Sequence, residues 1–567
     1  MERRHFLKTL ALSTPAVLWA NQLAQGADLS LSKKEGKSFA ADLVIAGGGM
    51  GGCAAALAAA RNGLTVILTE ETEWIGGQLT SQAVPPDEHR AIETHGATAT
   101  YRELRTRIRD YYRRNYPLTD HAKGQENLNP GQGGVSRLCH EPRVALAVLY
   151  EMLAPYLATG RLSILLNHRA VAAETDGDRI KGLVVQDLRN GVSRSLEAPY
   201  FIDATELGDL LPMTKTEYVT GAESQKDTGE LHAPETAQPD NMQAVTWCFP
   251  IEYVDGQDFV GDPPPDYAFW RDYVPELTPP WPGRLLSFTY TSPFTMEPRT
   301  LAFDPKTEAS GWWTYRRIAW LKNFQPGTYE GSISLINWPQ NDYLLGHFMG
   351  TEEENAKHFE GARRLSLALF YWLQTEAPRP DGGEGWAGLR LRPELVGTTD
   401  GLAMYPYIRE ARRIRAEFTV LEQHVGAHGR RAELGLPADA PVSAAVFDDS
   451  VGVGSYNIDL HPSTGGDNYI DVPSLRFQIP LGALIPQRVE NLLAANKNIG
   501  TTHITNGCYR LHPVEWNIGE SAGALIAFCK QKGLTPSQTR NTETHLRDFQ
   551  KMLIEDGVEL EWPAETS

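Results

Sequence analysis

The sequence predicts an α/β fold with a central parallel sheet and a second, inserted unit. A short apolar run at 41–46 leads directly into a glycine-rich turn, an alanine-rich stretch follows at 53–61, and a second apolar run occupies 65–69. Strand, turn, helix, strand is the order of a parallel βαβ unit. The chain is also long, 567 residues, and its middle has a distinct, aromatic-rich composition.

The glycine turn predicts a dinucleotide site. It consists of Gly47, Gly48, Gly49, Met50, Gly51 and Gly52. Gly47 permits the tight turn, Gly49 lets the backbone approach a pyrophosphate, and Gly52 lets the helix pack closely on the strand. The helix N-terminus then offers free N–H groups and a partial positive charge to the phosphates. Glu70 ends the second strand, 23 residues after Gly47, where an acid accepts hydrogen bonds from a ribose.

Later apolar runs extend the sheet and add a hairpin. The expected strands are 162–166, 170–174, 180–185, 200–205 and 491–495. The second and third of these flank a turn at 176–178, so they are expected to form a β-meander. A last helix is expected to open at Ile518 and to run through Ala527.

A second glycine pair indicates which dinucleotide is bound. Gly76, Gly77 and Gln78 come just after the second strand. In enzymes of the glutathione-reductase type such a loop passes close to a flavin, so the predicted cofactor is FAD. A helix N-terminus near the flavin would suit the charge that develops there on reduction. The other residues expected to contact the cofactor are Ala204, Gly519 and Ala522.

From about Ala41 to Phe528, with gaps, the chain resembles the FAD-dependent oxidoreductases of the succinate dehydrogenase and fumarate reductase-like superfamily, in particular a secreted bacterial group. The likeness is carried by the two glycine segments and by residues 407–414, 479–486, 500–503, Arg510, Gly519 and Gly523. It implies a Rossmann-like domain and non-covalent FAD, because no histidine in the second glycine loop matches a covalent flavin ligand. One departure is Glu206, which follows Asp-Ala-Thr where the family often has glycine.

The expected domain organisation is discontinuous. We expect an FAD-binding domain made of residues 40–85, 140–225 and 480–535. An aromatic-rich α+β substrate or cap domain is expected at 86–139 and 226–479, and a helical tail at 536–567.

The N-terminus has the pattern of an export signal. Arg3 and Arg4 precede a mildly apolar segment at 9–20 and a small-residue cleavage site. Paired arginines are typical of the twin-arginine type, which carries folded proteins, often with a cofactor already loaded. We therefore expect residues 1–26 to be removed and the mature protein to be periplasmic or secreted. Its charge would be about −20, because three cations and one acid leave with the leader.

The middle of the chain is expected to bind the substrate. Seven of the 13 tryptophans fall between 246 and 350, namely Trp247, Trp270, Trp281, Trp312, Trp313, Trp320 and Trp338. Exposed aromatic faces stack on sugar rings or aromatic compounds, and the alternative is that these side chains fill a core. The polar and aromatic run 337–343 is expected to be a loop that lines a site.

Three histidines are candidate bases. Oxidation by a flavin needs a base for the substrate proton, and histidine is the usual one. His461, His503 and His512 fall in the C-terminal stretch expected near the flavin, and each has the alternative of a buried structural role. Arg510 is expected to stabilise an anionic reduced flavin or to hold a substrate carboxylate.

Residues 409–417 give two conflicting indications. Arg409 and Glu410 are expected to begin a helix of alternating charge, in which an i, i+4 pair between Arg413 and Glu417 favours a solvated face. The family likeness instead makes Arg409 a site candidate.

Composition excludes several classes. The chain has 53 Lys and Arg against 71 Asp and Glu, a net charge of −18 without a basic stripe, so nucleic-acid binding is not expected. We expect no stable membrane span after signal removal, and no metal-binding pattern is present. Five cysteines without a CxxC pair argue against a disulfide scaffold, although one disulfide stays open in an exported protein.

The sequence is compatible with three functions. The leading one is an exported FAD-dependent oxidoreductase that oxidises a small organic substrate, with a sugar or glycoside as a candidate, by hydride transfer to non-covalent FAD. No second GxGxxG motif is present, so the expected electron acceptor is oxygen, a quinone or a periplasmic carrier. The second is a fumarate reductase-like reduction of a C=C bond, which needs an arginine cluster that the sequence does not identify. The third is a non-catalytic sugar-binding protein on a flavin fold.

Overall fold

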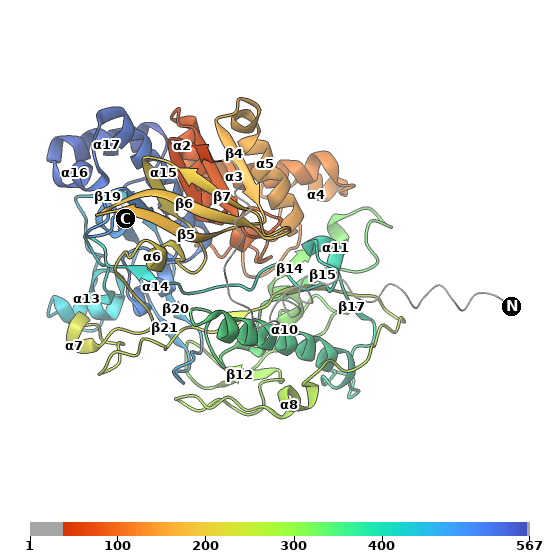
Figure 1. The fold of residues 1–567 in the computed structure, drawn as a ribbon. Coiled ribbons are helices and arrows are strands. Elements are labelled where there is room, and N and C mark those ends of the chain that lie inside the picture. The colour runs from red at the N-terminus through yellow and green to blue at the C-terminus, as the bar shows by residue number, and fades with distance from the viewer. Residues whose placement is uncertain (1–37, 564–567) are drawn as a thin grey trace, which may run out of the picture.

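A five-stranded parallel sheet forms the centre of one half of the molecule (Figure 1). The structure, a computed structural model, describes residues 38–563, so the expected signal at 1–26 lies outside the described residues. The strand order is β23–β8–β2–β3–β4, and every neighbouring pair is parallel. The bounds are β2 Leu43–Ala46, β3 Val66–Glu70, β4 Leu162–Leu166, β8 Tyr200–Asp203 and β23 Leu492–Ala494. These strands are continuous apolar runs because both faces of the sheet are covered.

Helices α2 (Met50–Arg61) and α5 (Pro142–Ala158) contact the strands of this sheet. Helix α15 (His512–Lys532) packs on α2, and α3 (Ala99–Asn115) packs on α5. Helices α2 and α15 touch through their backbones, since a Cβ on Gly519 would lie 2.0 Å from the Gly51 carbonyl oxygen and one on Gly523 would lie 2.2 Å from that of Ala55. Small residues on both helices therefore set this close approach.

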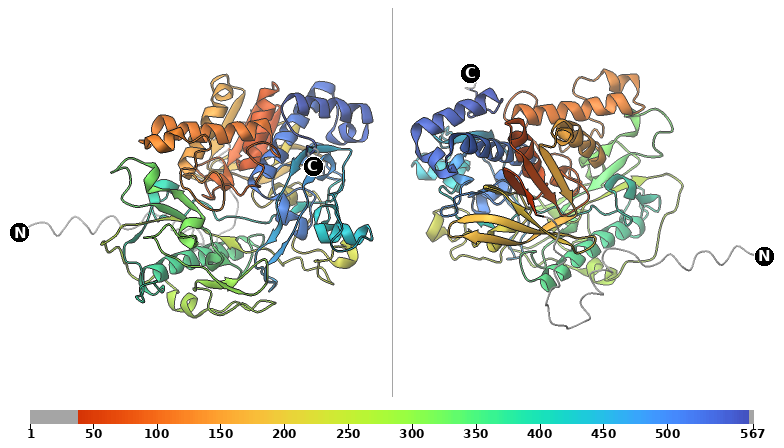
Figure 2. Two further views of the ribbon diagram at one scale, coloured as in Figure 1. Left: turned by 180° about the vertical axis from the view of Figure 1, so that it is seen from behind. Right: turned by 45° about the horizontal axis from the view of Figure 1, so that its top comes forward.

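A second sheet crosses the other face of the parallel sheet (Figure 2). It has the order β1–β7–β6–β5, with β1 Phe39–Ala40, β5 His168–Asp176, β6 Arg179–Asp187 and β7 Ser193–Glu197. Strands β5, β6 and β7 pair antiparallel in sequence order. The predicted Rossmann-like fold with a parallel sheet and a β-meander is thus confirmed.

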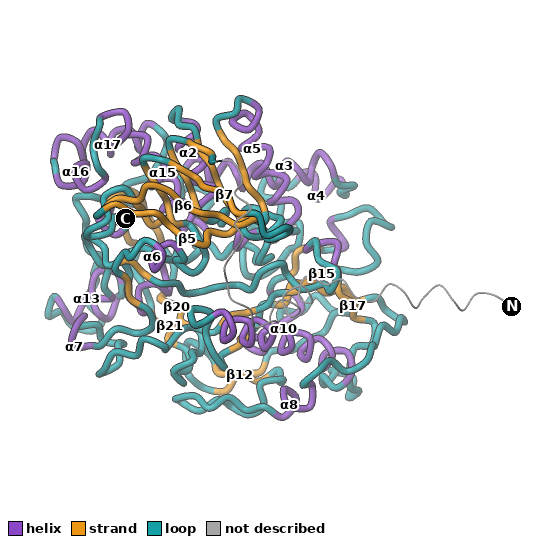
Figure 3. The backbone as a smooth tube through the Cα atoms, in the orientation of Figure 1, coloured by secondary structure: helices purple, strands orange, loops and turns teal. Residues whose placement is uncertain are grey.

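The other half of the molecule is an inserted α+β unit rich in loops (Figure 3). Its antiparallel sheet has the order β14–β15–β11–β17 and lies near the long helix α10 (Glu352–Thr375). The strand bounds are β11 Phe249–Tyr253, β14 Arg317–Ala319, β15 Ile333–Ile336 and β17 Leu389–Leu391.

The aromatic side chains of this unit form its core. Six of the seven tryptophans between 246 and 350 are buried, and only Trp320 is half-buried. Trp312 and Trp338 lie with ring centroids 5.2 Å apart, and Phe303 packs edge-on to Trp338. The alternative in which these aromatics fill a core is therefore the correct one, because burying their large apolar area stabilises a loop-rich unit.

The expected helix beginning at Arg409 is wrong. The segment is extended, and the short strand β18 (Arg413–Ile414) pairs with β9 (Tyr218–Val219). The side chains of Arg409 and Arg413 are 1% and 0% exposed, so the solvated face is wrong as well. Alternating charge was misleading here because each guanidinium is buried against a carboxylate from another segment, Arg409 against Asp342 and Arg413 against Glu223.

The helix expected from Ile518 begins earlier than predicted. Helix α15 starts at His512 instead of Ile518, with Leu511 as N-cap and a proline in its first turn. Two further helices, α16 (Pro536–Asn541) and α17 (Glu543–Glu555), follow it.

Three negative findings concern residues 38–563 only. No helix there is long and apolar enough to cross a membrane. No group of three or more His, Cys, Asp or Glu side chains in this range is placed to hold a metal ion. All five cysteines fall within it and are free and buried, so the disulfide left open by the sequence does not form.

Candidate active site and cofactor cleft

A cleft opens at the carboxyl ends of β2, β3 and β8. Its lining includes five residues that the sequence assigned to cofactor binding, Gly47, Gly49, Glu70, Gly77 and Ala204. Ligands of open α/β sheets bind in this position, outside the carboxyl ends of the strands.

The glycine turn has the geometry that its sequence predicts. Gly47 has φ +95°, and a Cβ there would lie 2.2 Å from the carbonyl oxygen of Ala204. A Cβ on Gly52 would lie 2.0 Å from the carbonyl oxygen of Gly47. Gly49 is the N-cap of α2, so Met50 opens the helix and its positive N-terminal end lies at the cleft.

Glu70 is held at the end of β3 by its neighbours. One carboxylate oxygen accepts a hydrogen bond from the Gly48 N–H at 2.9 Å. The other accepts from the N–H and hydroxyl of Thr72 at 2.8 and 2.7 Å. Burial raises the pKa of Glu70 to about 7. The carboxylate is thereby oriented at the edge of the cleft, where a ribose would lie.

The second glycine loop joins the cleft to the N-terminus of α15. Gly76 has φ +108° and donates its N–H to the Gly48 carbonyl at 2.7 Å. The short helix η1 (Gly77–Leu79) follows, and the Gln78 amide donates to the carbonyl of Arg510 at 2.9 Å. The Gln78 side-chain oxygen is buried and accepts no hydrogen bond from the described residues. The glycine turn, the N-terminal end of α2 and the free side-chain oxygen of Gln78 together fit a dinucleotide that extends from Glu70 to this loop.

His461 forms a dyad with an aspartate of the inserted unit. Its Nδ1 lies 2.6 Å from Asp342 in β16 (Asp342–Tyr343), so the ring donates this N–H and keeps Nε2 as an acceptor. Burial and the nearby Arg409 lower the pKa of His461 although Asp342 opposes them. The pKa of Asp342 is also lowered, because the Arg409 charge and the hydrogen bond from His461 outweigh its burial. We assign a neutral histidine beside a charged aspartate, in agreement with both directions.

Of three arginine–aspartate pairs in this region, one shares Asp342 with the dyad. The nearest N–O distance is 3.2 Å in each of Arg316–Asp87, Arg409–Asp342 and Arg510–Asp459. Tyr407 links two of them, because its hydroxyl accepts from Arg510 at 3.0 Å and its ring lies 4.9 Å from the Arg409 guanidinium. Asp459 also lies 4.0 Å from Nε2 of His461. The positive and negative charges of the three pairs cancel.

Two further tyrosines lie near these pairs. Tyr315 is 40% exposed, and burial raises its pKa to about 12, with Asp87 and Asp459 adding to the effect. Tyr456 is half-buried, and burial also raises its pKa, again with Asp87 and Asp459 adding to the effect. Both phenols thus lie near Asp459, the aspartate beside Nε2 of His461.

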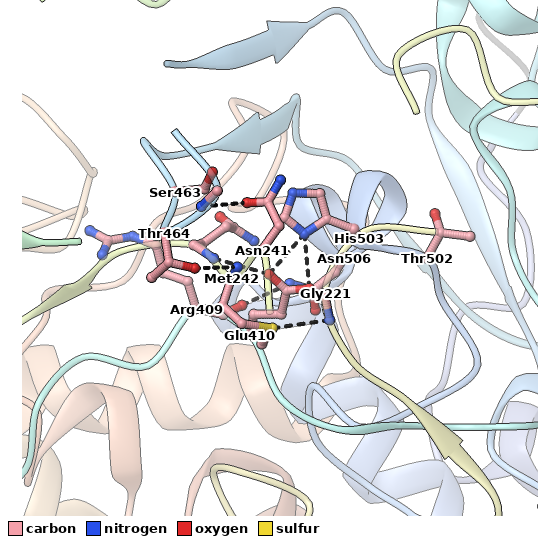
Figure 4. A network of polar contacts seen from close by, with 12 residues as sticks. Gly221, Asn241, Met242, Arg409, Glu410, Ser463, Thr464, Thr502, His503 and Asn506 are labelled. Carbon is pink, nitrogen blue, oxygen red and sulfur yellow. Dashed lines mark hydrogen bonds and ion pairs between the residues drawn. The ribbon is translucent and has the colours of Figure 1, made fainter. Parts of the chain in front are cut away.

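His503 and His512 have different surroundings. His503 opens α14 (His503–Tyr509), and its Nδ1 lies 2.9 Å from both oxygens of Glu410 (Figure 4). Burial alone would lower the pKa of His503, but Glu410 raises it above its ordinary value. Burial lowers the pKa of His512 to about 3, and its Nδ1 accepts from the Asp87 N–H at 3.1 Å. His503 is therefore part of an ion pair, and His512 is a neutral acceptor.

Gly519 and Ala522 lie inside α15, away from its N-terminus. The close approach of Gly519 to Gly51 gives it a packing role, and cofactor contact by Gly519, Ala522, Met50 and Gly51 stays a prediction.

Sequence reasoning missed several partners in the site. Asp342 lies in the 337–343 run, which was expected to line a site, and Asp459 precedes His461 by two residues. An aspartate two positions from a candidate base was a usable signal. The sequence held no such signal for Asp87, Arg316 and Tyr407, because only the fold brings these residues together.

The fold and the cleft define a dinucleotide-binding oxidoreductase of the flavin type. A family model described as FAD dependent oxidoreductase matches residues 42–553, and the chain belongs to this family. FAD is the cofactor that the family implies, and the cleft residues fit it.

No curated protein matches the sequence. Among solved structures, an E. coli quinol fumarate reductase is 12% identical, with 92% of this chain and 74% of that chain covered and a TM-score of 0.30. A geranylgeranyl bacteriochlorophyll reductase-like protein from Thermoplasma acidophilum is 11% identical, with 92% and 85% covered and a TM-score of 0.30. An L-proline dehydrogenase from P. horikoshii is 16% identical, with 34% of this chain and only 25% of that chain covered and a TM-score of 0.17. Likeness of this degree gives no information on substrate.

Proposed function

We propose that the protein oxidises a small, uncharged, hydroxyl-bearing organic compound, with a sugar or glycoside as the first candidate, and that His461 removes the proton. The observation that carries this proposal is the Asp342–His461 dyad, in which Nε2 is left as an acceptor. FAD, when bound, supplies the hydride acceptor.

The dyad has the properties of a general base. The His461 side chain is 19% exposed, so a substrate can reach it while its Nδ1 is fixed by Asp342. Its lowered pKa keeps it neutral near pH 7 and able to accept a proton. Asp342 stays ionised beside Arg409 and stabilises the imidazolium that forms.

The charge balance of the site favours a neutral substrate. Arg316, Arg409 and Arg510 converge, as a dicarboxylate site would require. Each guanidinium is already paired with an aspartate, so an added dicarboxylate would face three carboxylates as well as three cations. Tyrosine hydroxyls and carboxylate oxygens suit the hydroxyl groups of a sugar better, and fumarate reductase-like reduction is the weaker alternative.

Anaerobic mixing with neutral sugars, glycosides and fumarate tests the proposal, with loss of the oxidised-flavin absorbance as readout. We expect bleaching with a neutral compound, and a rate lowered about 100-fold or more in H461Q and D342N. The wild-type rate should rise with pH through a pKa below the ordinary value of 6.5, and this limb should be absent in H461Q.

His347 provides the matched control. It is a histidine 3.5 Å from a largely exposed Asp240, so H347Q should keep the wild-type rate. A normal bleaching rate in H461Q with FAD bound would refute His461 as the base, and turnover of reduced enzyme by fumarate would favour the alternative.

We propose in addition that the protein is exported folded, to the periplasm or medium, with FAD already bound, and passes electrons to oxygen, a quinone or a periplasmic carrier. The paired arginines Arg3 and Arg4 support export in the folded state. Five free cysteines also suit a chain that folds in a reducing compartment.

A further inference from the structure

A buried lysine lies beside the glycine turn. Lys497 follows β23 and its side chain is 0% exposed. Its Nζ lies 2.5 Å from Glu206 and 3.5 Å from Glu515. A buried amine needs such partners to remain charged. Burial alone would lower the pKa of Lys497, but these two carboxyl groups raise it, so Lys497 is a cation.

One of the partners fills the space between the two glycine loops. The Oε1 atom of Glu206 lies 2.7 Å from the position of a Cβ on Gly49 and 2.8 Å from that of a Cβ on Gly77. This oxygen is buried and accepts no hydrogen bond from residues 38–563. Glu206 is thus directed at the N-terminal end of α2, where phosphate groups bind in this fold.

The other partner, Glu515, belongs to a network in which two buried oxygens accept no hydrogen bond from the described residues. Glu515, in α15, is hydrogen-bonded by the Gln78 amide, and burial raises its pKa. Its Oε1 and the Oε1 of Gln78 are both buried without a partner among the described residues. Glu206 is the nearer of the two carboxyl groups to Lys497, so these two side chains form the charged pair.

A pyrophosphate that passes between Gly49 and Gly77 must meet this pair. It carries two negative charges, which the helix end and Lys497 attract and which the Glu206 carboxylate repels. We infer that Lys497 is a cofactor-binding residue that contacts the FAD pyrophosphate, and that Glu206 competes with the pyrophosphate for this lysine and for the glycine turn.

Binding titrations on protein stripped of flavin test this inference without any substrate. The probes are FAD, ADP, which keeps the pyrophosphate, and riboflavin, which lacks it. We expect K497M to weaken FAD and ADP at least tenfold and to leave riboflavin unchanged, whereas K497R keeps most of the affinity. E206Q should tighten FAD and ADP several-fold, because it removes the repelling charge.

Asp209 provides the matched control, because it lines the same cleft but pairs with Arg412. D209N should change the FAD affinity much less than E206Q does. If K497M does not fold, the E206Q/K497M double variant, which removes both charges, replaces it and should bind FAD more weakly than E206Q. Unchanged FAD affinity in a folded variant lacking Lys497, or weaker binding in E206Q, would overturn the inference.

Discussion

Two histidine–carboxylate pairs at the boundary of the two halves respond in opposite ways to their surroundings. Both rings donate Nδ1–H to a buried carboxylate, His503 to Glu410 and His461 to Asp342. The carboxylate outweighs burial at His503 and raises its pKa. At His461, Arg409 adds to burial and the pKa falls. Arg413 acts in the same direction at His503 but is outweighed there by Glu410, so the balance between arginine and carboxylate separates a structural ion pair from a candidate base.

The His503–Glu410 pair should stabilise the fold most at low pH. Because the pKa of His503 is raised in the folded state, its contribution is complete below the unfolded pKa and is lost as pH rises through the folded pKa. The H503Q variant removes one cationic partner of Glu410, which should lower the free energy of unfolding by about 3 kcal/mol. The difference in Tm between wild type and H503Q should thus be larger at about pH 6 than at about pH 9.

His424 offers the opposite case, since burial lowers its pKa. The Tm difference between wild type and H424Q should therefore not shrink as pH rises. A pH-independent difference for H503Q would show that His503 is neutral in the folded protein.

At the scale of elements, the packing of α2 on α15 depends on glycine. Alanine at Gly519 would favour the helix by about 1 kcal/mol through propensity, but its Cβ would lie 2.0 Å from the Gly51 carbonyl oxygen. We expect the clash to dominate, so G519A should lower Tm and weaken FAD binding, because α2 carries the glycine turn. Thermal melts and FAD titration measure both effects.

Gly124 is the matched control for this substitution. It lies in the short helix α4 (Asp120–Gly124), and a Cβ there would meet nothing within 4 Å. G124A should leave Tm unchanged or slightly raised. An equal loss in both variants would mean that helix packing is not the cause.

Elements were predictable where local pattern decides them. The glycine turn, Glu70 and the strands of the parallel sheet follow from short apolar runs and turn chemistry, and the structure confirms them. The partners of the candidate base cannot be predicted from local pattern, because Asp342 and His461 are 119 residues apart. The segment at Arg409 was misread because buried arginines and exposed ones look alike in sequence.

At the scale of the whole molecule, the fold buries every cysteine thiol. All five cysteines are free and buried, and burial raises the pKa of each, Cys139, Cys248 and Cys529 to about 12. A buried thiol with a raised pKa is unreactive. We expect an alkylating reagent to modify no cysteine in the native protein and five after unfolding, as mass spectrometry would count.

Because the five cysteines are free, we expect the thermal stability not to depend on a reductant. Tm should be identical with and without dithiothreitol, because no disulfide crosslinks the described residues. A fall in Tm on reduction would contradict the free state of the cysteines.

The order of strands in the parallel sheet has a consequence for synthesis. Strand β23 pairs with β8, and Leu492 lies opposite Phe201, so the sheet is unfinished until nearly the whole chain has left the ribosome. Such distant pairing raises the contact order and slows folding. The cleft also includes Tyr405 in its lining, so it is complete only late in synthesis. We therefore expect FAD uptake to follow translation, and a chain threaded unfolded through a pore would have to complete it on the far side.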